Sequence, residues 1–381
     1  MCKTARRAQL AQSLTSLRTW RWCFYINLPI GGFTVFAMLL FLDVESPKRG
    51  KLTFFQQMQK LDPLGALCFF PSIICLVLAL QWGGTTYAWS DPTMIGLLVT
   101  FAILFVAFIV VEARTPDTAM APPRVVLNRS VAASMFFCFL ISGAMSVIVY
   151  FIAIWFQAVK GDSATKAGIS TIPLVVAMVI AGFIMAKVTE RIGYYVPGML
   201  VAPILCATGA GMLSTMSRLS GHSQWIGYQV LFGLGLGSGF QQANLAAQTV
   251  LPRADVPIGM ALFFFMQQLG GSVALSIGQN ILSTKLVDQL TGIQGLNPTT
   301  IINTGATAIR TMVPPTQLTV VIDAYNFAIT RIFLMSAVLS AIMVVCAAST
   351  EWKSIKDAKK SGIVSKDGKE KIEKSESDTD V

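Results

Sequence analysis

The chain has 381 residues, of which 54% are hydrophobic and 13% charged, and its formal net charge at pH 7 is +10. Soluble domains carry about 25% charged residues, so this composition excludes a soluble globular protein and predicts an integral membrane protein. The positive charge lies between apolar runs and in a tail with eight lysines between Lys353 and Lys374, which favours membrane-flanking segments and no nucleic-acid partner.

Nine apolar segments follow one another along the chain, each of a length that can cross a bilayer. A helix needs about 20 largely apolar residues to do so, and the segments lack the alternation of barrel strands. We therefore predict an all-α fold, a polytopic membrane helix bundle with about nine transmembrane helices. The expected spans are 26–42, 64–82, 94–111, 131–156, 167–186, 196–216, 225–247, 256–281 and 332–349.

The first span is preceded by WRWCFYINLPIGG, residues 20–32. Trp20, Trp22 and Tyr25 suit the headgroup level of a membrane, where amphipathic rings gather. Pro29 then stands near the helix start, where its missing N–H costs little. Residues 1–25 are therefore predicted to be a polar and interfacial segment; a signal peptide or a mitochondrial presequence is the alternative for residues 1–42.

The gaps between the spans differ in basic residues. One set of gaps contains 18 Lys and Arg residues: 43–63, 112–130, 187–195, 248–255 and the C-terminal tail. The other set, which is the N-terminal segment and gaps 83–93, 157–166, 217–224 and 282–331, contains 11. The positive-inside rule then places the first set, the tail included, in the cytoplasm. The N-terminus falls outside, although its five basic residues would suit the inside. The tail from Glu351 to Val381 is expected to be disordered, because it is charged and poor in apolar residues.

No enzyme chemistry is indicated. His222 is the single histidine, and none of the seven cysteines forms a C-x-x-C pair, so we predict no catalytic residue, metal or cofactor. The sequence GLGLGSG, residues 233–239, resembles a dinucleotide loop but lies inside an expected span, without the strand that such a loop requires. Its two four-residue glycine spacings predict close helix packing instead.

Uncharged amides lie inside the seventh and eighth spans. Gln241, Asn244 and Gln248 share one helical face of the seventh, and the eighth carries Gln267 and Gln268 after an aromatic cluster. Polar groups at membrane depth face the bundle interior or a watery cavity. Two interpretations stay open: interhelical hydrogen bonds worth about 0.6 kcal/mol each, or a cavity that binds a substrate. The candidate substrate-binding residues are Gln241, Asn244, Gln248, Phe264, Gln267 and Gln268.

The acidic residues are expected to flank the spans without entering them. Asp62, Glu112, Glu190 and Asp255 stand at span ends. A proton-coupled carrier generally needs an ionisable group at membrane depth. On the sequence alone, this chain therefore shows no proton-coupling carboxylate.

The chain resembles the fungal fourteen-span drug:proton antiporters of the major facilitator superfamily, the multidrug and toxin efflux pumps. The carrying segments are WRWCFYINLPIGG (20–32), LDPLGALCFFPSIICLVLALQWGG (61–84), YFIAIWFQAVKGDSATKAGISTIPL (150–174), GYQVLFGLGLGSGFQQANLAAQTVLP (227–252), DVPIGMALFFFMQQLGG (255–271) and AYNFAITRIF with EWKS (324–354).

The resemblance implies a partial major facilitator fold that lacks the first five helices. Residues 26–42 would be the last helix of the N-terminal half, 43–130 a cytoplasmic loop with two linker helices, and 131–350 the six-helix C-terminal half. The implied function is proton-coupled efflux of small organic compounds such as drugs, toxins or secondary metabolites. The implied partners are that substrate, protons and the lipid bilayer, the coupling site lying outside this chain.

The resemblance also implies an address, which is usually the plasma membrane, with a vacuolar or vesicle membrane compatible. A second hypothesis is that the chain is a non-transporting membrane fragment, either inactive or a modulator of intact pumps. Alternating access requires two halves that rock around a midplane site, and this chain has one helix of the other half.

Overall fold

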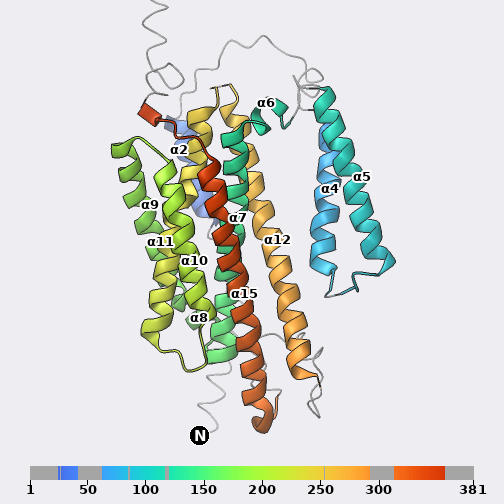
Figure 1. Ribbon diagram of the computed structural model, residues 1–381, viewed down its shortest axis with the longest axis vertical. Coiled ribbons are helices and arrows are strands. Elements are labelled where there is room, and N and C mark those ends of the chain that lie inside the picture. The colour runs from blue at the N-terminus through green and yellow to red at the C-terminus, as the bar shows by residue number, and fades with distance from the viewer. Residues whose placement is uncertain are drawn as a thin grey trace, which may run out of the picture. The chain divides into compact units, whose positions relative to one another are not determined.

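The computed structural model describes residues 25, 27–41, 62–84, 86–115, 120–252, 254–291 and 313–356. The regular structure in these ranges is helical (Figure 1). The helices are α2 (Asn27–Phe41), α4 (Pro63–Trp82), α5 (Pro92–Arg114), α6 (Pro123–Val126), α7 (Arg129–Trp155), the π-helix η1 (Phe156–Lys160), α8 (Ala164–Ser170), α9 (Ile172–Ile192), α10 (Val196–Ser214), α11 (His222–Val250), α12 (Val256–Leu290) and α15 (Pro315–Ser349).

The chain forms two compact units, residues 1–57 and 58–381. The first unit contains α2, a 15-residue apolar helix with no buried residue, which corresponds to the first expected span. The expected interfacial segment 1–25, apart from Tyr25, and the loop between α2 and Asp62 lie outside the described residues.

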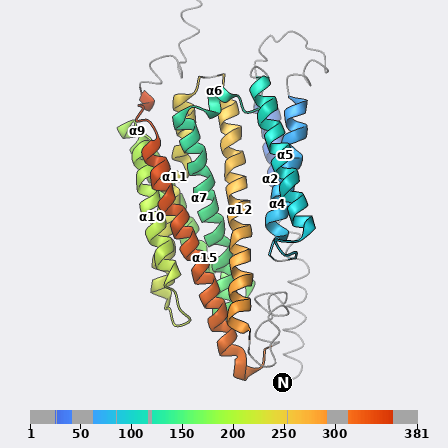
Figure 2. The same ribbon diagram turned by 45° about the vertical axis from the view of Figure 1, so that its right-hand side comes forward.

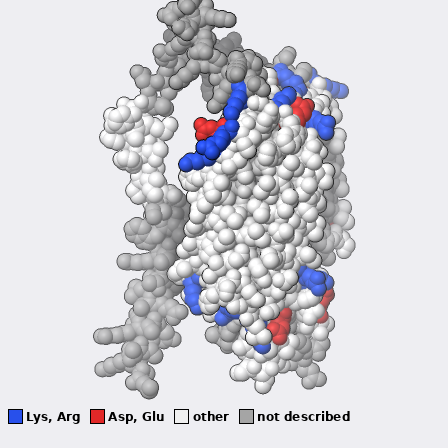
Figure 3. All heavy atoms as spheres, turned by 60° about the vertical axis from the view of Figure 1, so that its left-hand side comes forward, with Lys and Arg blue, Asp and Glu red and all other residues white. Residues whose placement is uncertain are grey.

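Seven helical segments in the described ranges are long and apolar enough to cross a membrane. They are Pro63–Trp82, Pro92–Arg114, Arg129–Lys160, Ala164–Ile192, Val196–Ser214, Val256–Leu290 and Pro315–Ser349. The seventh expected span is also a helix, α11, but its glutamines and Asn244 make it less apolar than these seven. On the face shown in Figure 3, the charged side chains of the described residues gather at the two ends and leave an uncharged band between them. The predicted fold class, a helical membrane bundle, is confirmed.

The second unit is built around α11. This helix packs against α9, α10 and α7, while α15 packs against α10, α7 and α12. Helices α4 and α5 form an antiparallel hairpin (Figures 1 and 2), and α4 contacts α12 through the rings of Phe69 and Phe265, whose centroids are 4.9 Å apart.

Two helices are much longer than the apolar runs that predicted them. The eighth span was expected to end at residue 281 and the ninth to begin at residue 332, but α12 continues to Leu290 and α15 begins at Pro315. The helix continues through charged residues such as Lys285, whose Nζ lies 3.1 Å from Asp288 Oδ2. Each helix has 35 residues, about 52 Å at 1.5 Å per residue, more than the hydrocarbon core of about 30 Å requires.

Connections from distant parts of the sequence meet at one end of the bundle, where α6 lies (Figure 1); we call it the α6 end. Arg124 of α6 donates to Asp255 before α12 through Nη2 (3.0 Å) and Nε (3.3 Å). The Glu351 N–H, just after α15, donates to Ser130 Oγ at 3.2 Å. These contacts join gaps that the charge pattern assigned to one side of the membrane.

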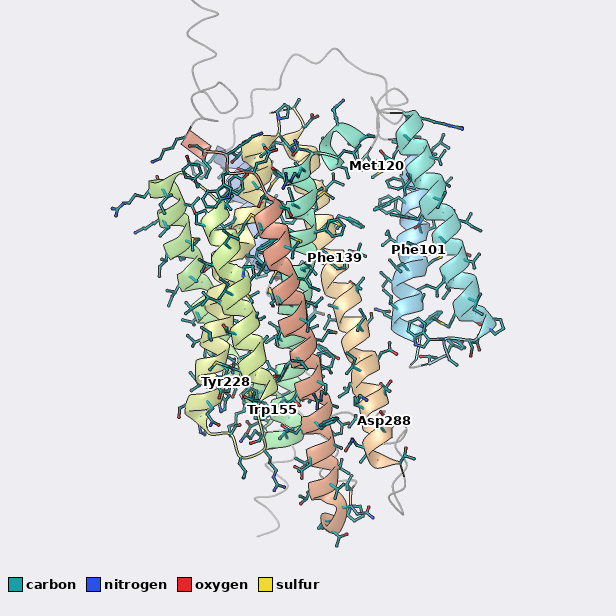
Figure 4. The ribbon with its side chains drawn as sticks, viewed as in Figure 1. Phe101, Met120, Phe139, Trp155, Tyr228 and Asp288 are labelled. Carbon is teal, nitrogen blue, oxygen red and sulfur yellow. The ribbon has the colours of Figure 1, made fainter. Side chains whose placement is uncertain are left out.

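At the opposite end of the bundle, side chains donate hydrogen bonds to carbonyl oxygens of other segments. Trp155 Nε1 donates to Asn326 Oδ1 (2.8 Å), and Asn326 Nδ2 donates to the Met216 carbonyl (3.2 Å). Lys160, at the end of the π-helix, donates to the carbonyls of Arg218 (2.8 Å) and Ser220 (2.7 Å). Figure 4 shows Trp155 at this end.

The glycines of α11 allow two neighbours to approach closely. A Cβ at Gly233 or Gly237 would overlap the carbonyl oxygen of Leu174 or Met178 on α9. The other pair, Gly235 and Gly239, faces α10. The two four-residue spacings therefore serve two different helices, and the packing interpretation of GLGLGSG is confirmed.

We predict that Gly237→Ala lowers the thermal stability of the chain in detergent by an amount equivalent to about 1–3 kcal/mol, because the added methyl group forces α9 away from α11. Gly227→Ala is the matched control on the same helix, since a Cβ there meets nothing within 4 Å. We expect the control to stay within about 0.5 kcal/mol of the parent or to gain stability. Equal losses in the two variants would contradict the packing account.

Candidate functional site

An open cavity of about 320 Å³, whose accessible lining is mostly apolar with amide groups among it, lies between α9 and α11 at the α6 end; we call it the α9–α11 cavity. Three of the six candidate residues line it: Gln241, Asn244 and Gln248. The remaining lining residues are Ala186, Thr189, Glu190, Gln242, Leu245 and Ile355.

The sequence of α11 explains why the cavity begins where it does. Gly237 contacts α9 at Met178 and Gly182. One turn further along, α11 carries Gln241, and long amide side chains continue to Gln248. The two helices touch through glycine and are then separated by amides, so a space lined partly by amides forms beyond the contact.

The hydrogen bonds in the cavity wall leave one acceptor without a donor. Thr189 Oγ1 donates to Gln242 Oε1 at 3.2 Å, and both residues are buried. Asn244 is 7% exposed, and no donor in the described structure reaches its Oδ1. A buried polar atom without a partner costs about 1–3 kcal/mol. The Oδ1 atom is itself covered in this conformation, so a ligand that donates an O–H or N–H reaches it only when the Asn244 side chain turns toward the cavity.

Charge around the cavity is limited to its rim. Glu190 is the charged residue in the cavity lining. It also borders an adjoining open depression of about 480 Å³, lined by Lys187, Val188, Glu190 and Arg191. The inner cavity wall is thus neutral and amide-rich, and such a wall suits an uncharged ligand better than an ion.

The three candidates on α12 lie apart from this cavity. Gln267 is 6% exposed; its carboxamide contacts the Cys138 thiol of α7, and its Nε2 has no partner among the described residues. Phe264 is 57% exposed, and Gln268 is exposed too. The structure therefore brings Gln241, Asn244 and Gln248 together. On α12, Gln267 lies at the interface with α7, whereas Phe264 and Gln268 lie on the outer face.

Six lining residues were not among the candidates, and two of them, Ala186 and Leu245, are apolar. Gln242 is adjacent to the predicted helix face, and the amides of Gln241 and Asn244 on that face could have suggested it. Thr189 and Glu190 belong to a segment interpreted as a cytoplasmic loop, which the structure shows to be the last turn of α9. Ile355 gives no sequence signal, because it follows the last span by several residues.

Several acids expected to lie at span ends are buried. Glu112 is 5% exposed and accepts the N–H groups of Met120 and Ala121, both at 3.1 Å. Asp62, also 5% exposed, accepts the Gly65 N–H at 3.0 Å at the start of α4. Both carboxylates organise the backbone around the ends of the α4–α5 hairpin. In the described ranges, no group of three or more His, Cys, Asp or Glu could hold a metal ion.

A bundle of membrane-length helices with an open cavity at one end defines a polytopic membrane protein. The model of the Major Facilitator Superfamily matches residues 9–275, and the chain belongs to this family. It is 44% identical over 341 residues to the MFS-type transporter VdtG of Byssochlamys spectabilis, covering 90% of this chain and 61% of that protein.

Two further relatives carry efflux names. The MFS-type efflux pump MFS1 of Arthroderma benhamiae is 43% identical over 343 residues (90% of this chain, 64% of the pump). The efflux pump aflT of Aspergillus parasiticus is 42% identical over 352 residues (91% and 68%). The chain is thus an integral membrane protein similar to fungal transporters and efflux pumps, and it spans 61% and 64% of the first two relatives' length.

We predict that Asn244→Leu keeps or raises the stability of the chain, because leucine has a similar size and removes an acceptor that has no donor. Asn326→Leu is the contrasting variant, because both polar atoms of the Asn326 amide are paired: its Oδ1 accepts from Trp155 Nε1 at 2.8 Å, and its Nδ2 donates to the Met216 carbonyl at 3.2 Å. Thermal unfolding in detergent should show a loss of about 1 kcal/mol for Asn326→Leu. A similar loss in Asn244→Leu would mean that Asn244 serves the fold alone.

Proposed function

We propose that this chain supplies the substrate-binding wall of a pump that exports small, uncharged organic compounds from the cytoplasm. The observation that carries the proposal is the α9–α11 cavity, in which Asn244 Oδ1 is buried without a donor among the described residues. The efflux names of the relatives support the direction of transport.

The finer assignment is to the fourteen-span drug:proton antiporters. In this assignment α4 and α5 are the linker helices, and α7 to α15 form the C-terminal half. The α6 end faces the cytoplasm, as the excess of Lys and Arg in its gaps suggests, and the plasma membrane is the proposed address. Protons drive the export.

We propose that proton coupling takes place outside the described part of this chain, because its buried carboxylates already have structural partners. Asp62 and Glu112 accept backbone N–H groups, and Asp255 pairs with Arg124. All three are held by structural partners at the α6 end, where they do not face the α9–α11 cavity.

The proposed substrate path extends beyond the cavity. Phe264 and Gln268 lie exposed on α12, and we propose that they and Gln267 continue the wall toward the opposite half of a complete transporter. Alternating access would then move that half against this wall.

The test is a resistance assay in a yeast strain that lacks its own drug exporters. The chain is expressed both alone and joined to the part of the VdtG relative that it does not match. We predict that Gln241→Ala changes the spectrum of tolerated compounds without lowering surface abundance, because it removes an amide from the cavity wall.

Gln268→Ala separates the cavity from the longer path. A changed spectrum in both variants supports the whole predicted wall, and a change in Gln241→Ala alone restricts recognition to the cavity. Unchanged spectra in both variants would overturn the site. Resistance from the joined protein but not from the chain alone would favour the second hypothesis for this chain, a non-transporting fragment.

A further inference from the structure

Six residues that follow α15 are held against the turn between α9 and α10; we call residues 351–356 the C-terminal clasp. The Ile355 N–H donates to the Gly193 carbonyl (2.8 Å), and Lys356 Nζ donates to the Arg191 carbonyl (2.8 Å). The Tyr195 hydroxyl donates to the Glu351 carbonyl at 2.6 Å. The tail was expected to be disordered from Glu351, but its first six residues have a defined position; residues 357–381 lie outside the described part.

The sequence of the α9–α10 turn fits this contact. Gly193 ends α9 with φ of +86°, a conformation that other residues rarely adopt. A Cβ on Gly193 would lie 3.2 Å from Lys356 Cδ, so the glycine also leaves room for the clasp. Burial, followed by the nearby Glu351 charge, raises the pKa of Tyr195 to about 12.

The clasp forms part of the cavity wall. Ile355 lines the α9–α11 cavity together with Gln241 and Gln248, although it belongs to no transmembrane helix. Its backbone position is fixed by the hydrogen bond to Gly193, which directly follows the α9 turn that carries Glu190. The clasp can therefore move away from the cavity without a change in the packing of the transmembrane helices.

The attachment of the clasp is light in comparison with the helix core. Trp352 is 61% exposed, and Glu351, Lys353 and Lys356 are also exposed. The hold consists of the hydrogen bonds described above, including that of the Glu351 N–H to Ser130, a ring contact of 6.3 Å between Trp352 and Tyr194, and the partial burial of Ile355 against the core. Segments with few buried contacts open at low free-energy cost.

We propose that the C-terminal clasp is a movable wall that controls access to the α9–α11 cavity from the α6 end, and that Ile355 limits the size of what the cavity admits. The proposal rests on the proposed function in one respect only, namely that the molecule admitted to the cavity is a transported substrate. Access to the cavity can be measured without any substrate.

The test uses the full 381-residue chain, purified in detergent, with Asn244→Cys as a reporter of access, because Asn244 lines the cavity and is only 7% exposed. A charged methanethiosulfonate reagent modifies this cysteine, and the parent chain without the reporter gives the background from the native cysteines. Adding Tyr195→Phe removes one hydrogen bond of the clasp. We expect the modification rate to rise about tenfold, the shift that a bond of about 1.4 kcal/mol would give.

Tyr228→Phe is the matched control, because Tyr228 lies near the start of α11, toward the end of the bundle opposite the clasp (Figure 4). Ile355→Pro is a second opening variant, which removes the N–H that donates to Gly193 and leaves the buried ring of Tyr195 in place. The proposal requires faster modification in Tyr195→Phe and in Ile355→Pro than in Tyr228→Phe. Equal rates in well-folded Ile355→Pro and Tyr228→Phe would overturn it, whatever the resistance assay shows.

Discussion

The structure depends on the close contact of α11 with α9 and α10. Membrane helices satisfy their own backbone hydrogen bonds and gain little from burying apolar surface against each other. Their packing therefore relies on small residues, and Gly233 and Gly237 meet backbone carbonyls of α9 directly. With Gly235 and Gly239 turned to α10, α11 is fixed between two neighbours, and the position of every amide that it carries is fixed with it.

The same contact determines where polar chemistry is placed. Beyond Gly237, α11 changes from glycines to amides, and the α9–α11 cavity occupies the resulting space. The cavity lies beside the turn that ends α9, where the C-terminal clasp is held, and the Arg124–Asp255 pair lies at the same end of the bundle. The close helix packing at membrane depth makes most of the cavity wall rigid. The C-terminal clasp, which is held more weakly at the α6 end, is the part of the wall that can move.

The sequence predicted the helices well, because apolar runs of sufficient length have few alternatives in a membrane. It misplaced the ends of α12 and α15, where helix continues through charged residues beyond the bilayer. For the site, helical spacing brought Gln241, Asn244 and Gln248 together correctly in one cavity. Thr189 and Ile355 could not be predicted, because they reach the cavity through contacts between distant segments that no local pattern encodes.

The central claim is that the α9–α11 cavity holds the exported compound. The most direct measurement is a structure by electron cryomicroscopy with a compound to which expression of the joined protein confers resistance. The account predicts density between α9 and α11, with a donor group of the compound directed at Asn244 Oδ1. Density for the compound at another place, with an unchanged α9–α11 cavity, would contradict the account.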